Sequence, residues 1–322
     1  MARSKTPRVL ISRPLPDAVI ARAQDLFELE LRDNTQPMSE AEMRSALALY
    51  DGVMPTLGDM FSGRVFADFG RPRCRILANF GVGYNHIDVQ AARDHGVKVT
   101  NTPGAVTDAT ADIAMTLILM SARRAAEGER LVRAGQWQGW HPTQMLGMHV
   151  TGRTVGIVGM GRIGQAIARR CHFGFGMEVL FHNRSAREME FPARQVGSLA
   201  DLAAQVDILV IALPGGAETH HMIDAGVFTA MPPHAHLINI ARGNIVDEAA
   251  LIQALQSGQI AGAGLDVYEF EPEVPEALRD MNNVTLLPHL GTAALNVRTD
   301  MGMMVLDNLQ AFFEGRTPPN LV

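Results

Sequence analysis

The feature that most constrains the fold of this chain is a glycine-rich turn within "TVGIVGMGRIGQAIARRC", residues 154–171. β-Branched and apolar residues before the turn predict a strand, and the apolar spacing after it predicts an amphipathic helix. Gly159, Gly161 and Gly164 have the G-x-G-x-x-G spacing of a dinucleotide-binding turn, in the strand–turn–helix context that confirms such a motif. We predict that Gly159 allows the tight turn, Gly161 lets the backbone approach a pyrophosphate, and Gly164 allows close helix–strand packing. The free N–H groups at the start of the helix would then bind the phosphates.

Short apolar runs alternate with helical patterns along the rest of the chain, which indicates an α/β protein with parallel sheets. A capping box, Ser39 with Glu42 three residues later, predicts the start of one helix. Strands are expected at 8–12, 52–55, 75–79 and 97–100 before the turn, and at 177–181, 207–212, 236–240, 262–267 and 284–287 after it.

Two long helical stretches, 109–135 and 292–315, flank the region that contains the glycine-rich turn. This pattern suggests that one domain is inserted into another. We expect an α/β fold of two doubly wound parallel-sheet domains, in which a Rossmann NAD(P)-binding domain (105–292) is inserted into a flavodoxin-like substrate domain (1–104 and 293–322).

Composition excludes several other classes of protein. The net charge of −6 over 322 residues argues against a nucleic-acid binder, which usually has a basic surplus. No apolar run reaches the roughly 18 residues that a membrane-spanning helix needs. Two cysteines cannot build a disulfide framework, so a reducing compartment is expected. The sequence therefore predicts a cytoplasmic protein without a membrane or nucleic-acid partner.

The stretch "FHNRS" (181–185) lies about where a dinucleotide-binding fold often has an acidic residue for the ribose. This chain has Asn183, Arg184 and Ser185 there instead. A guanidinium group matches the geometry of a phosphate, and the two neutral side chains can donate hydrogen bonds without adding negative charge. The stretch therefore favours NADP (NADPH) as cofactor, with NAD still possible.

Three kinds of chemical group follow three expected strands in the second half of the chain. Arg242 follows "HLINI", a glutamate-rich segment with Glu269, Glu271 and Glu273 follows "GAGLDVY", and His289 follows "VTLLP". In open α/β sheets, ligands bind outside the carboxyl ends of the strands. Reduction of a 2-keto acid needs a cation for the carboxylate, a hydride donor and a proton donor. Arg242, one of the carboxylates and His289 suit these needs, although each residue alone is more often structural or solvated.

The remaining histidines do not predict a metal site. His220–His221 and His234-x-His236 are short-range pairs with no third ligand at a recognisable spacing. We therefore expect no metal.

At this point the sequence resembles the D-2-hydroxyacid dehydrogenase family over nearly its whole length. It is most similar to the glyoxylate/hydroxypyruvate reductase branch, in which stretches like "HNRS" accompany a preference for NADPH. The resemblance depends on "NFGVGYNHID" (79–88), "GRTVGIVGMGRIGQAIA" (152–168), "LINIARGNIVDEAALIQAL" (237–255), "GAGLDVYEFEPE" (262–273) and "LLPHLGTA" (286–293).

The resemblance implies roles for individual residues. It implies that Arg242 binds the substrate, that His289 transfers the proton, and that Glu271, which directly precedes a proline, is the acid partner of the histidine. The backbone N–H groups of Val82 and Gly83 would bind the substrate carboxylate. The implied cofactor contacts, beyond the three glycines and residues 183–185, are Thr110, Arg162, Ile163, Pro214, Ala241, Asp266 and Gly291.

The family also implies a homodimer formed through the helices near 105–145. Trp140 lies in this region and could reach the neighbouring subunit's pocket, but packing at the dimer interface is the simpler interpretation. Two alternatives stay open: an NAD(H)-dependent D-2-hydroxyacid dehydrogenase with another substrate preference, and a dinucleotide-sensing binding protein similar to the corepressors of this fold.

Overall fold

The computed structural model describes residues 6–322 and divides the chain into two compact units. Domain 1 comprises the chain up to Val106 together with Ala293–Val322, and domain 2 comprises Thr107–Thr292. Domain 2 is thus one continuous stretch, whereas domain 1 is built from two stretches that lie on either side of it in the sequence. Each domain contains one parallel sheet, which confirms the α/β fold of two parallel-sheet domains.

The sheet of domain 1 has five parallel strands in the order β2-β1-β3-β4-β5. This is the flavodoxin-like order of a doubly wound sheet. The strands are β1 (Arg8–Ile11), β2 (Glu28–Leu31), β3 (Gly52–Met54), β4 (Ile76–Ala78) and β5 (Lys98–Thr100).

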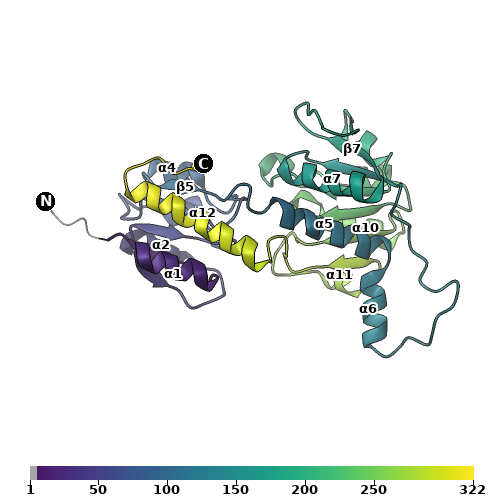
Figure 1. Cartoon of the computed structure of the whole chain (residues 1–322), viewed down its shortest axis with the longest axis horizontal. Helices are drawn as coiled ribbons and strands as arrows, with labels where there is room; N and C mark the ends of the chain where they lie inside the picture. Colours follow the sequence, from purple (N-terminus) through teal and green to yellow (C-terminus); the bar gives the residue numbers. More distant parts are fainter. Residues whose placement is uncertain (1–5) are drawn as a thin grey trace. The chain divides into compact units, whose positions relative to one another are not determined.

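Helices cover both faces of this sheet. They are α1 (Asp17–Leu26), α2 (Glu40–Leu49), α3 (Gly63–Phe66), α4 (Val89–Asp94) and α12 (Leu295–Phe313). Helices α1 and α12 lie side by side and share one apolar core with β1, although they come from opposite ends of the chain (Figure 1). Gly302 allows this approach, because a Cβ there would lie 2.4 Å from Cγ2 of Val19. The predicted capping box is confirmed at α2, where Ser39 N–H donates to Glu42 and Glu42 N–H donates to Ser39 Oγ.

The sheet of domain 2 has seven parallel strands in the order β12-β11-β10-β9-β6-β7-β8. Counted from β6, this is the Rossmann order 3-2-1-4-5-6 with one further strand. The strands are β6 (Thr154–Val158), β7 (Glu178–His182), β8 (Arg194–Gln195), β9 (Ile208–Ile211), β10 (His236–Asn239), β11 (Gly262–Leu265) and β12 (Val284–Leu286).

Two apolar clusters, one on each face, fix the helices of domain 2 on its sheet. Helices α5 and α7 pack together on one face, and α8, α9 and α10 pack on the other. The α-helices are α5 (Thr107–Ala122), α6 (Ala125–Arg133), α7 (Arg162–Phe175), α8 (Leu199–Ala203), α9 (Ala225–Ala230), α10 (Glu248–Gln256) and α11 (Glu276–Asp280), and two 3₁₀ turns are η1 (Ala217–Thr219) and η2 (Gly243–Ile245). No helix within residues 6–322 is both long and apolar enough to cross a membrane.

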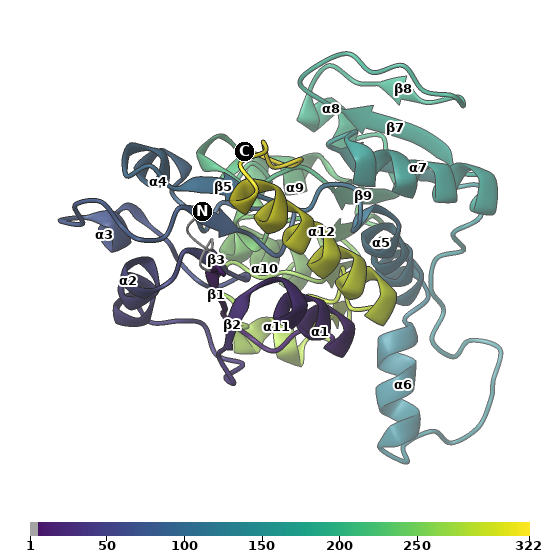
Figure 2. The same ribbon diagram turned by 60° about the vertical axis from the view of Figure 1, so that its left-hand side comes forward.

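The structure adds two strands that the sequence did not predict, β2 and β8. Each forms one edge of its sheet and pairs with a single neighbour, as Figure 2 shows for β8 beside β7. Their residues are mostly exposed, so they lack the apolar run that identifies a buried strand.

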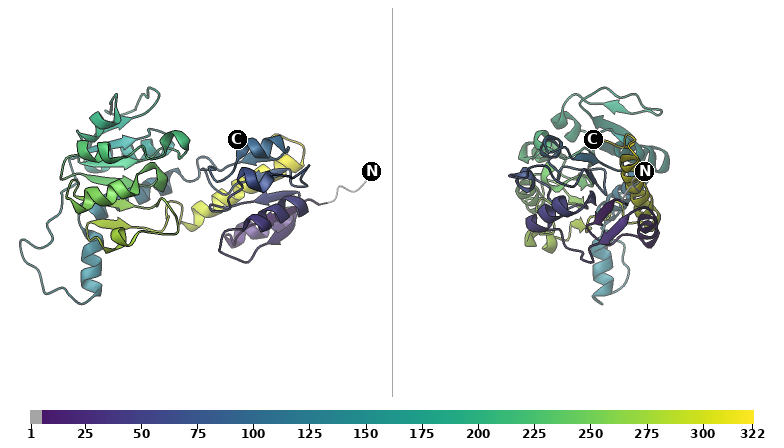
Figure 3. Two further views of the ribbon diagram at one scale, coloured as in Figure 1. Left: turned by 180° about the vertical axis from the view of Figure 1, so that it is seen from behind. Right: turned by 90° about the vertical axis from the view of Figure 1, so that its left-hand side faces the viewer.

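The prediction of a single long helix at 109–135 was wrong, because the structure has two helices there, α5 and α6. Arg124, between them, has a left-handed backbone conformation with φ of 54°. The segment at 147–148 packs against this break: Met148 N–H donates to the Ala122 carbonyl, and a Cβ on Gly147 would lie 2.5 Å from that oxygen. Helix α6 and the irregular segment after it extend away from the rest of domain 2 (Figure 3).

Candidate active site

The glycine-rich turn joins β6 to α7 at the point where the strand order of domain 2 reverses, between β6 and β9. Gly159 has φ of 98°, and a Cβ there would lie 2.8 Å from Cβ of Leu213, in the segment after β9. A Cβ on Gly164 would lie 2.1 Å from the Gly159 carbonyl oxygen. The structure therefore confirms that Gly159 is needed for the turn and Gly164 for close helix–strand packing.

Gly161 differs from these two glycines, because a Cβ there would meet no atom within 4 Å. It is the N-cap of α7, so Arg162 and Ile163 begin a helix whose first N–H groups have no acceptor within the helix. Open space beside such N–H groups fits the pyrophosphate of a dinucleotide.

The neighbouring "FHNRS" segment follows β7 and is organised by Asn183. The Met160 N–H donates to Asn183 Oδ1 over 3.2 Å, and Asn183 Nδ2 donates to the Ser185 carbonyl over 2.9 Å. Asn183 therefore connects the glycine-rich turn to this segment, a structural role that the sequence did not predict.

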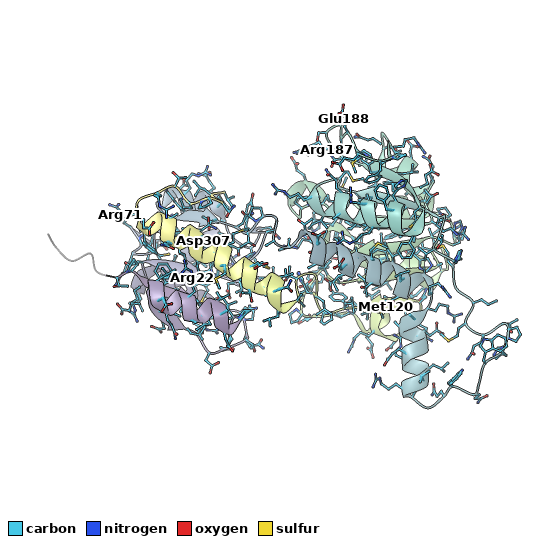
Figure 4. The ribbon with its side chains drawn as sticks, in the orientation of Figure 1. Arg22, Arg71, Met120, Arg187, Glu188 and Asp307 are labelled. Carbon is cyan, nitrogen blue, oxygen red and sulfur yellow. The ribbon has the colours of Figure 1, made fainter. Side chains whose placement is uncertain are left out.

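The Arg184 side chain is 95% exposed and lies 3.8 Å from the Glu218 carboxylate. Both partners of this ion pair are almost fully solvated, so the attraction is weak. The guanidinium is accessible to a ligand. Arg187 and Glu188 lie further along the same segment and are also exposed (Figure 4).

Three neighbouring strands, β10, β11 and β12, end at the same edge of the domain 2 sheet. Arg242 follows β10, Glu271 follows β11 and His289 follows β12. The topology thus brings the three predicted catalytic residues to one edge.

His289 and Glu271 form a hydrogen-bonded pair, with His289 Nδ1 and Glu271 Oε2 2.9 Å apart. Burial by itself raises the pKa of Glu271, but the His289 ring, the Tyr268 N–H and the Arg242 charge together lower the pKa of this carboxyl group. Glu271 is therefore a carboxylate at neutral pH. Of the other two glutamates, Glu269 bonds to His221 instead, with Nε2 and Oε1 2.7 Å apart.

Several residues that sequence reasoning missed hold Arg242 in place. Buried Asn239 accepts from the Ala241 N–H and donates to the Arg242 carbonyl, each over 3.0 Å. Two glycines give the space: a Cβ on Gly215 would lie 2.8 Å from Arg242 Cγ, and one on Gly243 would lie 1.8 Å from the Tyr268 carbonyl carbon. Burial lowers the pKa of Arg242, and the Glu271 charge opposes this shift. No spacing in the sequence indicates these supports, because they act through tertiary contacts.

Asp266 organises the turn that contains His289. Its carboxylate accepts from the Leu290 N–H over 2.6 Å and from the Gly291 N–H over 2.9 Å, and its carbonyl accepts from the His289 N–H. Burial raises the pKa of Asp266, and these N–H groups oppose the shift. Thr110 adds a further contact, since Oγ1 donates to the Gly291 carbonyl over 3.2 Å. The turn gives His289 a left-handed conformation with φ of 56°.

Val82 and Gly83 belong to domain 1 and lie in the loop after β4. Side-chain amides fix this loop: Asn101 donates to the Val82 carbonyl over 2.9 Å and Asn79 to the Gly83 carbonyl over 3.1 Å. Within the described part of the chain, no hydrogen bond involves the N–H groups of Val82 and Gly83. The loop therefore has fixed carbonyl groups and two N–H groups that can bind an anion.

The other predicted contact residues have separate positions. Pro214 follows β9, and its carbonyl accepts from the Thr219 hydroxyl. Ala241 is buried beside Arg242. Trp140 lies in the irregular segment after α6 and is 80% exposed.

Similarity to known proteins shows the family of this chain. The model of the D-isomer specific 2-hydroxyacid dehydrogenase NAD-binding domain matches residues 115–291. The chain belongs to the D-2-hydroxyacid dehydrogenase family, it is an enzyme of that family, and domain 2 contains the family's NAD-binding domain.

Individual relatives are similar over almost their full length. Glyoxylate reductase of Thermococcus onnurineus is 42% identical over 98% of this chain and 96% of the relative. The enzyme of the same name from Thermococcus kodakarensis is 43% identical over the same shares. Among solved structures, the NADPH-dependent glyoxylate/hydroxypyruvate reductase of Sinorhizobium meliloti, in complex with NADP and malonate, has a TM-score of 0.87 and 38% identity, covering 99% of this chain and 97% of that one.

Proposed function

We propose that this protein reduces the small 2-keto acids glyoxylate and hydroxypyruvate to the corresponding 2-hydroxy acids, with NADPH as the reductant. The observation that supports this most is the placement of Arg242 and the His289–Glu271 pair at adjacent strand ends of a dinucleotide-binding domain. The relatives named glyoxylate reductase support the choice of substrate.

Each residue has a distinct part in the proposed reaction. The reduced nicotinamide, when bound, supplies a hydride for the carbonyl carbon. Arg242 binds the substrate carboxylate and polarises the carbonyl group. In domain 1, the backbone N–H groups of Val82 and Gly83 are the proposed anion ligands. His289 gives a proton to the carbonyl oxygen, so the keto acid gains one hydride and one proton and becomes the hydroxy acid.

The hydrogen bond to Glu271 assigns roles to the two nitrogens of His289. Nδ1 is held by the carboxylate at 2.9 Å. Nε2 is then the atom that transfers the proton.

The preference for NADPH rests on Arg184, which is exposed, and on the lack of an acidic residue among positions 183–185. A 2′-phosphate would gain charge-assisted hydrogen bonds from the guanidinium, whereas the ribose of NADH would meet no carboxylate there. Ser185 offers a neutral donor beside it.

We also propose a homodimer formed through domain 2. Four large apolar side chains of the segment from α6 to residue 147 are exposed: Val132, Trp137, Trp140 and Leu146. Such a concentration is typical of a surface that a second chain covers. Light scattering at micromolar concentration should give twice the mass of the chain, 34.9 kDa.

The decisive experiment measures kcat/KM for glyoxylate and hydroxypyruvate, each with NADPH and with NADH. The same four values are measured for Arg184→Ala and, as a matched control on the same segment, for Arg187→Ala. Loss of a charged hydrogen-bonding group should lower kcat/KM with NADPH roughly 10–100-fold in Arg184→Ala, while Arg187→Ala should stay near wild type.

Three results would contradict the proposal at different points. Absence of turnover with both keto acids would refute the reaction. Turnover with an unchanged NADPH preference in Arg184→Ala would refute only the role of Arg184. Activity with NADH but not NADPH would favour the NAD(H)-dependent alternative.

A further inference from the structure

A second group of chemically reactive side chains lies in domain 2, outside the proposed catalytic residues. His220 and His221 follow η1, and Glu269 follows β11. One ligand atom from each of the three lies within 4.8 Å of the other two. Among residues 6–322, this is the one cluster of three or more histidine, cysteine or acidic side chains close enough to share a metal ion. Spacing in the sequence did not reveal it, because Glu269 is 48 residues from His221.

The backbone holds the segments that contain these ligands against each other. His221 has a left-handed conformation with φ of 50°, and its N–H donates to the Asn244 carbonyl over 2.9 Å. Asn244 belongs to the 3₁₀ turn η2, and so does Gly243. Gly243 packs against the backbone at Tyr268 and Glu269, since a Cβ on Gly243 would lie 2.3 Å from the Glu269 nitrogen. Residues 243–245 thus hold the histidine segment close to the glutamate segment.

The local charge favours a cation. Glu248, a second carboxylate, is only 8% exposed and accepts from the Glu269 N–H over 3.4 Å. Glu248 therefore lies beside the backbone of Glu269, and the cluster itself contains one carboxylate and two imidazoles. The side chain of Glu269 is 11% exposed, while His220 is exposed, so an ion can enter from the histidine side.

The ligand set indicates the kind of metal. Two imidazole nitrogens and one carboxylate oxygen suit Zn²⁺ and its neighbours in the transition series, whereas Mg²⁺ and Ca²⁺ prefer oxygen ligands. Around a tetrahedral Zn²⁺, ligand atoms lie about 3.4 Å apart for metal–ligand distances of about 2.1 Å. The His221–Glu269 contact of 2.7 Å must therefore widen. The His220 ring, stacked on His221 with centroids 3.9 Å apart, must turn, which its exposure permits.

We propose that His220, His221 and Glu269 form a binding site for a divalent transition metal, with Zn²⁺ the best fit and water as the fourth ligand. The proposal is independent of the reaction assigned to Arg242, Glu271 and His289.

The test measures Zn²⁺ affinity of the full-length, chelator-treated protein at pH 7.5 by competition with a chromophoric chelator. His220→Ala is the informative variant, because it removes one ligand and leaves the His221–Glu269 hydrogen bond intact. His141→Ala, which removes an exposed histidine elsewhere in domain 2, is the matched control. We expect one site per chain in the wild type and in His141→Ala, and affinity at least about tenfold weaker in His220→Ala. Co²⁺ should give the visible absorption of a low-coordinate site in the wild type and lose it in His220→Ala.

Equal affinity of the wild type and His220→Ala would overturn the proposal, because Zn²⁺ would then bind elsewhere or not at all. An equal loss in His141→Ala would also overturn it, since the effect would reflect surface histidines in general. Glu269→Gln gives a second check: it keeps the shape of the side chain but removes the anionic ligand, so it should weaken binding as His220→Ala does.

Discussion

At the scale of single residues, His289 and Glu271 show how one contact determines which atoms can react. Glu271 occupies Nδ1 of the imidazole, and the neighbouring N–H of Tyr268 holds the carboxylate from its other side at 3.0 Å. The lowered pKa of Glu271 follows from these contacts, which together outweigh the effect of burial. In the proposed reaction, His289 is the proton donor and Glu271 orients the ring.

The first prediction separates these two roles. His289→Ala should lower kcat for glyoxylate reduction by about 10²–10⁴-fold, because general acid catalysis is lost. Glu271→Gln should lower kcat by a smaller factor, because the amide keeps the shape of the side chain and can still hydrogen-bond to the ring. Steady-state kinetics with glyoxylate and NADPH measure kcat for both variants. A kcat of Glu271→Gln equal to that of the wild type would show that the charge of the carboxylate has no part in the reaction.

A second prediction concerns His236, which is 7% exposed and bonded through Nδ1 to Ser121 Oγ over 2.8 Å. Burial, followed by the charge of His234, lowers the pKa of His236 from 6.5 to about 4. The unfolded chain therefore binds a proton more readily, and stability should fall as the pH drops from 6.5 towards 4. The shift corresponds to about 3 kcal/mol.

Urea unfolding at pH 7 and pH 4.5 measures this effect. His236→Gln should lose less stability between the two pH values than the wild type, while the exposed control His149→Gln should behave as the wild type does. An acid sensitivity unchanged in His236→Gln would assign the loss to other groups.

At the scale of elements, the turn between β6 and α7 separates residues needed for folding from those available for binding. Gly164 has no room for a methyl group, because the Gly159 carbonyl lies in its place. Gly161 has room, and the free N–H groups of α7 begin beside it. The spacing of the motif therefore serves two physical purposes.

The third prediction compares alanine at these two positions. Gly164→Ala should lower the free energy of unfolding by about 1–3 kcal/mol or more through overpacking. Gly161→Ala should keep its stability but bind NADPH roughly 10–100-fold more weakly, because the methyl group occupies the path of the pyrophosphate. Urea denaturation and cofactor titration by fluorescence measure both. Normal NADPH affinity in a stable Gly161→Ala would place the pyrophosphate elsewhere.

Strand prediction from sequence succeeded where the strand is buried and failed at the exposed sheet edges. β6, β9 and β10 are wholly or almost wholly buried and were predicted from their apolar runs. The edge strands β2 and β8 have mostly exposed residues and gave no such signal. The break at Arg124 was missed because it depends on the distant segment 147–148.

At the scale of the whole molecule, the two domains differ in how they depend on chain connectivity. Both apolar clusters of domain 2 lie entirely within residues 107–292. One cluster of domain 1 includes Val305, Leu306 and Leu309 of α12, which follow domain 2 in the sequence. Domain 1 therefore cannot complete its core until the C-terminal stretch is present.

The fourth prediction follows from this difference. A fragment of residues 107–292 should unfold cooperatively in urea and bind NADPH, because its core is complete. A fragment of residues 1–106 should not unfold cooperatively, because the face of its sheet that α12 covers would be exposed. Circular dichroism and NADPH titration measure both, and cooperative unfolding of the shorter fragment would refute the argument.

By itself, the sequence determined the fold class, the glycine-rich turn and the three strand-end positions of the candidate site, because these depend on local spacing and on apolar periodicity. Before the resemblance to a known family was considered, it could not choose among Glu269, Glu271 and Glu273. The resemblance selected Glu271 as the partner of His289, and the tertiary structure shows that contact. The tertiary structure alone placed Glu269 on His221, and it alone showed that Asn239 and Asp266 hold the turns that contain Arg242 and His289. These contacts join residues from different strands and loops, and their distances depend on how the sheet packs. No local sequence pattern indicates those distances.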